Sequence, residues 1–217
     1  MQAKAQAARA ALKLVRNGMT VGLGTGSTAA VFIEELAARN RREHLDLTCV
    51  ATSIACEKQA RALGLHVAGL GEVKKIDLAV DGADQVDRRL NLIKGGGGAH
   101  AREKVVDYAA AKFVVIAVES KLVARLAGAV PLEILPFALP LAARQVQREF
   151  GAKVVARKVL SDNGLVLADA HFKPIANPGK LEAGLCAIPG IAANGIFSRN
   201  VHGAFFGSET GARWVRR

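Results

Sequence analysis

Four consecutive glycines, residues 95–98, are the feature of this sequence that most limits how the chain can fold. Glycine loses more backbone freedom on folding than any other residue, so an ordered run of glycines needs a reason. A flexible linker would carry serine and polar neighbours, but this run joins an apolar segment, residues 90–93, to a helix-forming segment, residues 99–112. We therefore expect a strand-to-helix turn whose backbone N–H groups can closely approach an anion or a substrate oxygen.

Two charged residues flank this glycine loop. Lys94 enters the loop, and Glu103 lies about one turn into the helix that leaves it. Taken alone, the segment is explained equally well by a tight turn with a solvated lysine and a solvated glutamate. The alternative is a site at which a lysine and a carboxylate are brought to a ligand.

A second loop of the same character is Gly24-Thr25-Gly26-Ser27-Thr28, which follows an apolar strand at residues 19–23 and opens a helix. It lacks the Gly-Lys-Ser/Thr ending of a nucleoside-triphosphate loop and the third glycine of a dinucleotide-binding fingerprint. It remains a loop rich in amides and hydroxyls, free of carboxylates, at a helix N-terminus, which suits a phosphate monoester. The plainer alternative is that Ser27 or Thr28 only caps the helix.

A third loop, Asp81-Gly82-Ala83-Asp84, follows an apolar strand at residues 76–80, and Asp87 comes three residues later. Carboxylates gathered at the end of a buried strand raise one another's pKa and attract a cation or a shared proton. The spacing is not that of a calcium loop, and no His or Cys lies near enough in sequence to indicate a transition metal. A metal site and a solvated turn stay open, but the pattern favours carboxylates that bind hydroxyls or relay a proton.

The composition agrees with a compact folded protein. A chain of 217 residues that is 51% hydrophobic can bury a full core in one large domain or two small ones. No apolar run reaches membrane-spanning length, and the N-terminal residues lack the apolar region of a signal peptide. Cys49, Cys56 and Cys186 are isolated and lack metal-binding spacing, so we expect reduced thiols in a cytoplasmic protein.

The net charge of +11 raises the question of nucleic-acid binding. The basic residues are spread along the whole chain, and aromatic residues, which would stack on bases, make up only 5% of it. We therefore expect neither a nucleic acid nor a membrane as a partner. The basic balance is instead interpreted as a solvated surface that attracts small anions.

Helix-forming segments and apolar strands alternate through the first part of the chain. Such alternation predicts right-handed crossovers and a mostly parallel sheet, with ligands bound beyond the carboxyl ends of the strands, where all three loops lie. Ser53 is expected to cap the third helix. The expected strands are residues 19–23, 45–51, 65–68, 76–80 and 113–118, and the expected helices are residues 3–15, 28–39, 55–63 and 99–112.

After about residue 127 the expected order changes to β-α-β-β-α-β, which is ferredoxin-like, and Asp162-Asn163-Gly164 forms the turn of its hairpin. The expected strands are residues 130–137, 153–159, 165–172 and 191–197, and the expected helices are residues 138–150 and 179–187. The predicted fold class is α/β: a Rossmann-like, mostly parallel sheet domain with an inserted ferredoxin-like α+β lobe. We assign residues 1–127 plus 198–217 to the catalytic domain and residues 128–197 to the lobe.

Together, the three loops resemble those of ribose-5-phosphate isomerase of type A. The matching segments, which extend over nearly the whole chain in the family's order, are Gly24-Thr25-Gly26-Ser27-Thr28, Asp81-Gly82-Ala83-Asp84, Lys94-Gly95-Gly96-Gly97-Gly98-Ala99, Arg102-Glu103-Lys104, Glu119-Ser120-Lys121-Leu122-Val123, Leu135-Pro136-Phe137-Ala138, Asp162-Asn163-Gly164 and Ile188-Pro189-Gly190 with Asn194-Gly195-Ile196-Phe197. Val118 stands where the family usually has Asp, His100 and Ala101 replace an apolar pair, and Leu165 stands where Asn is common.

The resemblance implies an aldose–ketose isomerase that interconverts D-ribose 5-phosphate and D-ribulose 5-phosphate. That reaction needs a base for a proton beside a carbonyl and stabilisation of the enediolate oxygens. We expect Glu103 to be the base, Lys94 to stabilise the oxyanion and Asp81 to move protons during ring opening. The expected substrate-binding residues are Thr25, Gly26, Ser27, Thr28, Asp81, Gly82, Ala83, Asp84, Lys94, Gly95, Gly96, Gly97 and Lys121, with the phosphate at Lys121 and the Ser/Thr loop.

We expect no metal and no other cofactor, a small-molecule sugar phosphate as ligand and, as the resemblance implies, a homodimer or higher homo-oligomer. A related sugar-phosphate deaminase or acyl-transfer protein would share the fold and the first loop, but the segment from Lys94 to Glu103 argues against it. A catalytically silent sugar-phosphate sensor would need a partner or DNA-binding module, and the expected elements leave no segment for one.

Overall fold

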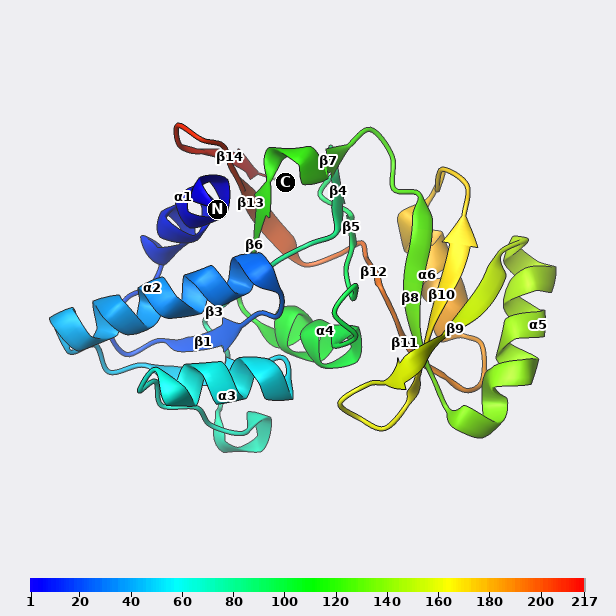
Figure 1. Cartoon of the computed structure of the whole chain (residues 1–217), viewed down its shortest axis with the longest axis horizontal. Coiled ribbons are helices and arrows are strands. Elements are labelled where there is room, and N and C mark those ends of the chain that lie inside the picture. The colour runs from blue at the N-terminus through cyan, green and yellow to red at the C-terminus, as the bar shows by residue number, and fades with distance from the viewer. Residues whose placement is uncertain (217) are drawn as a thin grey trace. The chain divides into compact units, whose positions relative to one another are not determined.

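The computed structural model describes residues 1–216 and divides the chain into two compact units (Figure 1). Unit 1 contains Met1–Ala83, Val105–Lys121 and the residues from Asn200 onward, and unit 2 contains Asp84–Lys104 and Leu122–Arg199. None of the helices found between residues 1 and 216 has the length and apolar character needed to cross a membrane.

Unit 1 is built on a sheet of six described strands in the order β14-β13-β6-β3-β1-β2. Neighbouring strands are parallel, apart from the antiparallel pair β13 and β14. The inner strands are almost wholly buried and read as continuous apolar runs, as strands covered on both faces do. The strands are β1 (Thr20–Leu23), β2 (Thr48–Ala51), β3 (Leu78–Asp81), β6 (Phe113–Val118), β13 (Val201–Gly207) and β14 (Ala212–Arg216).

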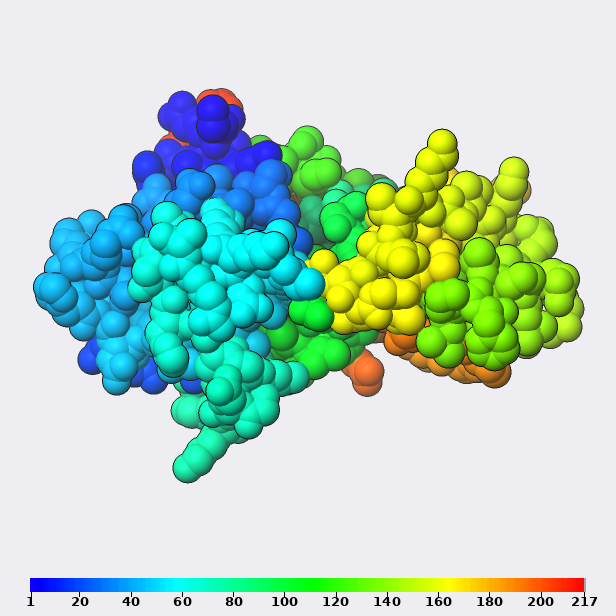
Figure 2. Space-filling model, turned by 60° about the horizontal axis from the view of Figure 1, so that its bottom comes forward, coloured from blue at the N-terminus to red at the C-terminus, as the bar shows by residue number. Residues whose placement is uncertain are grey.

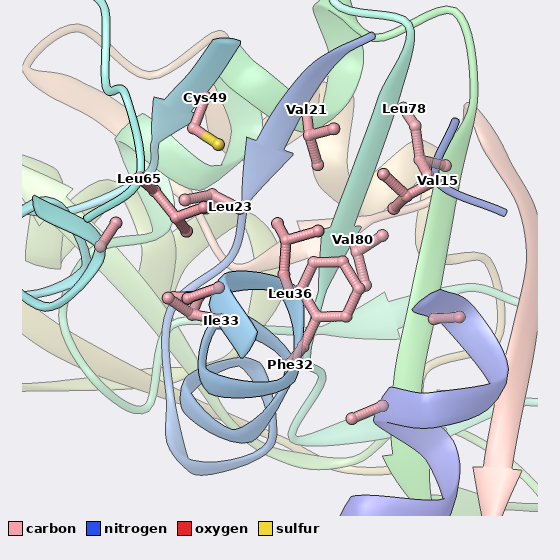
Figure 3. Packing of buried hydrophobic residues seen from close by; sticks show 14 of the residues in the cluster. Val15, Val21, Leu23, Phe32, Ile33, Leu36, Cys49, Leu65, Leu78 and Val80 are labelled. Carbon is pink, nitrogen blue, oxygen red and sulfur yellow. The ribbon is translucent and has the colours of Figure 1, made fainter. Parts of the chain in front are cut away.

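Helices α1 (Gln2–Leu12), α2 (Ser27–Glu43) and α3 (Ile54–Ala62) pack on this sheet. In Figure 3, Phe32, Ile33 and Leu36 of α2 point toward buried side chains of β1 and β3. The blue-to-cyan segment that contains α2 and α3 forms the surface of unit 1 that faces the viewer in Figure 2. Ser53 caps α3 as expected, because its hydroxyl accepts the N–H of Cys56.

Unit 2 contains a sheet of four described antiparallel strands in the order β11-β8-β10-β9. This order and the sequence of elements are ferredoxin-like, so the predicted α/β fold class with an α+β lobe is confirmed. The core contains buried residues of β8, β10, α5 and α6. The elements are β8 (Gly128–Ile134), α5 (Leu139–Phe150), β9 (Lys153–Leu160), β10 (Val166–Phe172), α6 (Pro178–Cys186) and β11 (Ile191–Asn194).

A second small sheet in unit 2, in the order β12-β5-β4-β7, lies outside the sequence prediction. Its strands have two or three residues each, too few to show a period in the sequence. Residues 84–104, 122–127 and 198–199 group with unit 2, which contains this sheet, whereas the predicted domain boundaries assigned them to the catalytic domain. The strands are β4 (Gln85–Asp87), β5 (Leu92–Ile93), β7 (Leu122–Val123) and β12 (Ile196–Phe197).

Other differences are local. The strand expected at residues 65–68 forms only a single bridge, between Cys49 and Val67. Helix α4 (His100–Ala109) ends three residues before its expected end, and the boundary between the units falls inside it, after Lys104. Short 3-10 turns form at η1 (Leu70–Glu72), η2 (Glu119–Lys121) and η3 (Pro136–Ala138).

His100, the first residue of α4, is completely buried although the family resemblance predicts an apolar residue there. Its ring fills the space beside Gly95, where a Cβ would lie 2.7 Å from His100 Nδ1. Burial and, secondarily, the positive charge of Lys104 lower the pKa of His100 to about 3, against a hydrogen bond with the backbone of Ala193. At neutral pH His100 is therefore an uncharged packing residue, and its 3.9 Å approach to Glu133 is not an ion pair.

This burial predicts a pH-dependent stability. The unfolded chain protonates the histidine near its usual pKa of about 6.5, whereas the folded protein resists protonation down to about pH 3. The part of the stability that depends on neutral His100 is therefore fully present above about pH 6.5. It is lost as the pH decreases toward about 3, because the unfolded chain binds the proton before the folded protein does. His100→Leu should remove this dependence, so that its thermal midpoint falls less than that of the wild type between about pH 7 and about pH 4.5.

The matched control is His66→Gln, because His66 is exposed. This variant should follow the wild type at every pH. Parallel declines of the wild type and His100→Leu would contradict the assignment.

Candidate active site

Lys94 and Glu103 form a buried pair in unit 2. Lys94 follows β5, and its Nζ lies 3.4 Å from Oε2 of Glu103 in the first turn of α4, with the two side chains 2% and 4% exposed. The Lys94 ammonium also lies 5.4 Å from the ring centre of Phe197, and the Lys94 N–H donates to the carbonyl of Gly195. Two of the three residues expected to be catalytic, Lys94 and Glu103, are therefore adjacent and shielded from water, where charge interactions are strong.

The loop between them is ordered by its own backbone and by Asp84. Gly95 and Gly98 have φ values of 99° and 80°, a region that side chains disfavour, and the Gly98 N–H donates to the Gly95 carbonyl. Oδ2 of Asp84 accepts the N–H of Gly96 at 2.8 Å. Asp84 is thus hydrogen-bonded directly to the glycine loop within unit 2.

The first turn of α4 is held by a carboxylate that the sequence reasoning missed. Glu133 of β8 is completely buried, and its Oε1 accepts the N–H of Ala101 at 3.0 Å. Its Oε2 accepts the side-chain N–H of Asn163 at 3.2 Å, and Asn163 Oδ1 accepts the Nε–H of Arg102. A carboxylate at a helix N-terminus accepts from an otherwise unpaired N–H, and its negative charge interacts favourably with the positive end of the helix dipole. The turn that carries Glu103 is therefore fixed from β8 and from the β9–β10 hairpin.

Lys104, which follows Glu103, makes a second buried ion pair. Its Nζ donates to Oε1 of Glu182 at 2.8 Å and to the carbonyl of Ile196 at 2.6 Å. Burial lowers the pKa of Lys104, and the charge of Glu182 opposes that shift. Oε2 of Glu182 also accepts the hydroxyl of Ser198 at 2.6 Å. Because Lys104 lies 4.7 Å from the ring centre of Phe197, this pair supports the same aromatic ring that Lys94 contacts.

In unit 1, Asp81 organises the loop that follows β1. Asp81 is completely buried at the end of β3, and its Oδ1 accepts the N–H groups of Thr25 at 2.9 Å and Gly82 at 2.6 Å. Gly24 packs against Asp81 so closely that a Cβ there would overlap the carboxylate. The Gly24–Thr28 loop and Asp81 are thus held together by hydrogen bonding and close packing. Residue 24 must be glycine because a side chain there would overlap the Asp81 carboxylate.

The hydroxyl of Thr25 is used inside the protein. It forms hydrogen bonds of 2.7 Å with Thr52 Oγ1 and 2.8 Å with Ser53 Oγ. The Gly24–Thr28 loop therefore stays open to a ligand mainly through residues 26–28, and Thr25 holds it in place.

Helix α2 begins at Ser27, and its N-cap is Gly26 with a φ of 110°. The alternative that Ser27 or Thr28 is an ordinary cap is therefore wrong, since both lie inside the helix and the N-cap residue Gly26 makes no side-chain hydrogen bond. Glycine is needed because few other residues adopt this φ. The first N–H groups of α2 consequently face out of the helix beside the Ser27 and Thr28 hydroxyls, the arrangement that favours an anion.

Two lysines of unit 1 belong to this region. Lys4 of α1 donates to Ser27 Oγ at 2.8 Å, although nothing in the sequence distinguishes it from a solvated helix lysine. Lys121 ends η2, directly after β6. Because β1, β3 and β6 are parallel, the loops that carry Ser27, Asp81 and Lys121 lie at the same edge of the sheet.

The expected site residues thus form two sets. Thr25, Gly26, Ser27, Thr28, Asp81, Gly82, Ala83 and Lys121 belong to unit 1, whereas Asp84, Lys94, Gly95, Gly96, Gly97 and Glu103 belong to unit 2. Within residues 1–216, no group of three or more His, Cys, Asp or Glu side chains is arranged to hold a metal ion.

Comparisons with known proteins give one result. The family model for ribose 5-phosphate isomerase A (phosphoriboisomerase A) matches residues 48–211. The curated ribose-5-phosphate isomerase A of Methanosarcina acetivorans is 44% identical over 216 residues, covering 96% of this chain and 92% of that protein. The structure of ribose 5-phosphate isomerase A from Methanocaldococcus jannaschii has a TM-score of 0.94 and 39% identity, covering 99% of this chain and 98% of that one. A D-ribose-5-phosphate isomerase in complex with phospho-erythronic acid has a TM-score of 0.95 and 39% identity, covering 99% and 97%. The chain belongs to the ribose 5-phosphate isomerase A family.

Proposed function

We propose that this protein interconverts D-ribose 5-phosphate and D-ribulose 5-phosphate, with Glu103 as the base. The buried contact between Lys94 and Glu103 carries the proposal, because it places a carboxylate and a fixed positive charge side by side at a glycine backbone. Membership of the isomerase family supports the same reaction. The proposed place of the reaction is the non-oxidative branch of the pentose phosphate pathway, in a cytoplasmic homodimer or higher homo-oligomer.

The proposed chemistry moves one proton between neighbouring carbons. In the open-chain aldose, Glu103 removes the proton from C2, and the electron pair forms the C1–C2 double bond of an enediolate as charge shifts to the C1 oxygen. Transfer of the C2 hydroxyl proton to the C1 oxygen, and return of a proton from Glu103 to C1, then yield the ketose with no net gain or loss of protons. Lys94 stabilises the developing oxyanion. Stabilisation of charge by a fixed group, in a site that excludes water, is usually the largest single contribution to the rate of such a reaction.

Asp81 and Asp84 act on the sugar hydroxyls in this proposal. Asp81 moves the proton that ring opening requires, and the buried carboxylate is held for that task by the N–H groups of Thr25 and Gly82. Asp84 binds a hydroxyl while its other contact, with the Gly96 N–H, keeps it beside the glycine loop. Gly82, Ala83, Gly95 and Gly97 contribute backbone groups and space for the substrate.

The phosphate is assigned to unit 1, at the N-terminus of α2. Gly26, Ser27 and Thr28 offer N–H and hydroxyl donors there, and Lys4 and Lys121 supply positive charge. The solved relative in complex with phospho-erythronic acid supports this class of ligand, since that molecule pairs a phosphate with a planar carboxylate shaped like an enediolate.

The first test of this function is Glu103→Gln. The amide keeps the size and hydrogen bonding of the side chain but cannot accept the proton, so kcat should fall by about 10²–10⁴ while KM changes little. Glu149→Gln, at an exposed glutamate of the same unit, is the control and should keep full activity. If Glu103→Gln stayed active while Asp81→Asn abolished turnover, the base would be Asp81.

The second test concerns the phosphate. Lys4→Ala and Lys121→Ala should each lower kcat/KM for ribose 5-phosphate about 10-fold or more, the usual worth of a charged hydrogen bond. The slow residual reaction of unphosphorylated ribose should hardly change, because it lacks the group that these lysines bind. Lys13→Ala, at an exposed lysine just beyond α1, is the control. Equal losses on both substrates would place the lysines elsewhere in the mechanism.

A further inference from the structure

Arg157 of β9 contacts the glycine loop, although no sequence motif includes it. Its Nη1–H donates to the carbonyl oxygens of Gly95 and Gly96 at 3.2 and 3.1 Å. These are the two residues that directly follow Lys94. Because the carbonyls belong to glycines with wide conformational freedom, an external donor that fixes both of them removes freedom that the loop itself cannot remove.

Asp169 of β10 holds Arg157 in this position. The Nε–H and Nη2–H of Arg157 donate to the two Asp169 carboxylate oxygens at 2.8 and 2.6 Å, a bidentate arrangement. The two side chains are only 20% and 22% exposed. Bidentate pairing of this kind fixes the plane of the guanidinium, so that Nη1 points in one direction. The Arg157–Asp169 pair is therefore a rigid link between strands β9 and β10.

Arg157 also acts on Asp84. The pKa of Arg157 is raised, first by its hydrogen bonds to Asp169 and further by the charge of Asp84. Asp84 in turn accepts the N–H of Gly96, whose carbonyl accepts from Arg157. The peptide groups of Gly96 are thus held on both sides, by Asp84 at the N–H and by Arg157 at the carbonyl.

We propose that Arg157 is a positioning residue for the isomerase reaction: it fixes the glycine loop and Asp84, and through them the placement of Lys94 beside the substrate. The inference rests on the proposed function, because the reaction is what the loop serves. It adds a residue from the ferredoxin-like sheet to the catalytic arrangement, acting through the carbonyls of Gly95 and Gly96.

The experiment compares wild type, Arg157→Lys, Asp169→Asn and Lys158→Ala. Lysine keeps the charge but has no planar fork, so it cannot hold Asp169 and two carbonyls together. Arg157→Lys should lower kcat about 10- to 100-fold and change KM much less, since misplaced groups weaken the transition state most. Asp169→Asn should cause a smaller loss of kcat. Lys158, exposed on the same strand, is the control, and Lys158→Ala should leave kcat unchanged.

Hydrogen exchange measures the loop without any turnover. The Gly96 amide donates to Asp84 and the Gly98 amide donates to the Gly95 carbonyl, so both should exchange faster in Arg157→Lys, while amides of β8 and β10 keep their wild-type protection. A double-mutant cycle with Asp84→Asn then tests the path of the effect. If Arg157 acts partly through Asp84, the double variant loses less activity than the product of the two single losses.

The outcomes separate this inference from the proposed function. A wild-type protein inactive on ribose 5-phosphate would defeat the function, and Gly96 exchange would still decide whether Arg157 anchors the loop. In an active enzyme, unchanged kcat in Arg157→Lys, or unchanged exchange at Gly96, would overturn the positioning role. Faster exchange throughout β8 and β10 with a lowered thermal midpoint would also overturn it, because Arg157 would then serve the stability of unit 2 as a whole.

Discussion

The buried contact between Lys94 and Glu103 requires support from the side chains around it in unit 2. Removing an ion pair from water costs several kcal/mol per charge, and the attraction of the pair repays this only with good geometry and further hydrogen bonds. The surrounding structure supplies such support. Glu133 holds the first turn of α4, the Lys104–Glu182 pair flanks the ring of Phe197, and Arg157 holds the glycine loop. Each of these contacts restricts one of the two segments that bear the pair.

In the proposed function, unit 1 has a different task, the binding of a phosphate, although it contains a buried carboxylate. Its Gly24–Thr28 loop is held by a buried carboxylate, Asp81, through N–H groups, and by the hydroxyls of Thr52 and Ser53. The negative charge is thereby turned toward the loop's own amides, while the N-terminus of α2 and the side chains of Lys4 and Ser27 stay available. In the proposed function, the segments that follow β1, β3 and β6 supply both the rigid support of the Gly24–Thr28 loop and the groups that bind the phosphate.

The sequence predicts those features whose causes are local. Glycine runs, a loop at a helix N-terminus and carboxylates after a buried strand carry their own signals, so the three loops and the order of helices and strands followed from them. Lys4, Glu133 and Arg157 carry no such signal, because each contacts a segment at least 23 residues away in the chain. The β12-β5-β4-β7 sheet was missed because its strands have only two or three residues, and both outer strands, β12 and β7, pair with segments far away in the chain. His100 shows a third limit, since only the packed structure explains why a polar ring fills the space beside Gly95.

Turnover of the wild-type protein in heavy water tests whether the proposed proton transfer passes through an enediolate and needs no metal ion. Protein dialysed against a chelator and supplied with ribose 5-phosphate should form ribulose 5-phosphate with solvent deuterium at C1, observed by nuclear magnetic resonance. Deuterium enters there because a carboxylate base exchanges its proton with solvent before returning one to carbon. Absence of conversion until a divalent ion is restored, or conversion with no deuterium at C1, would contradict the account.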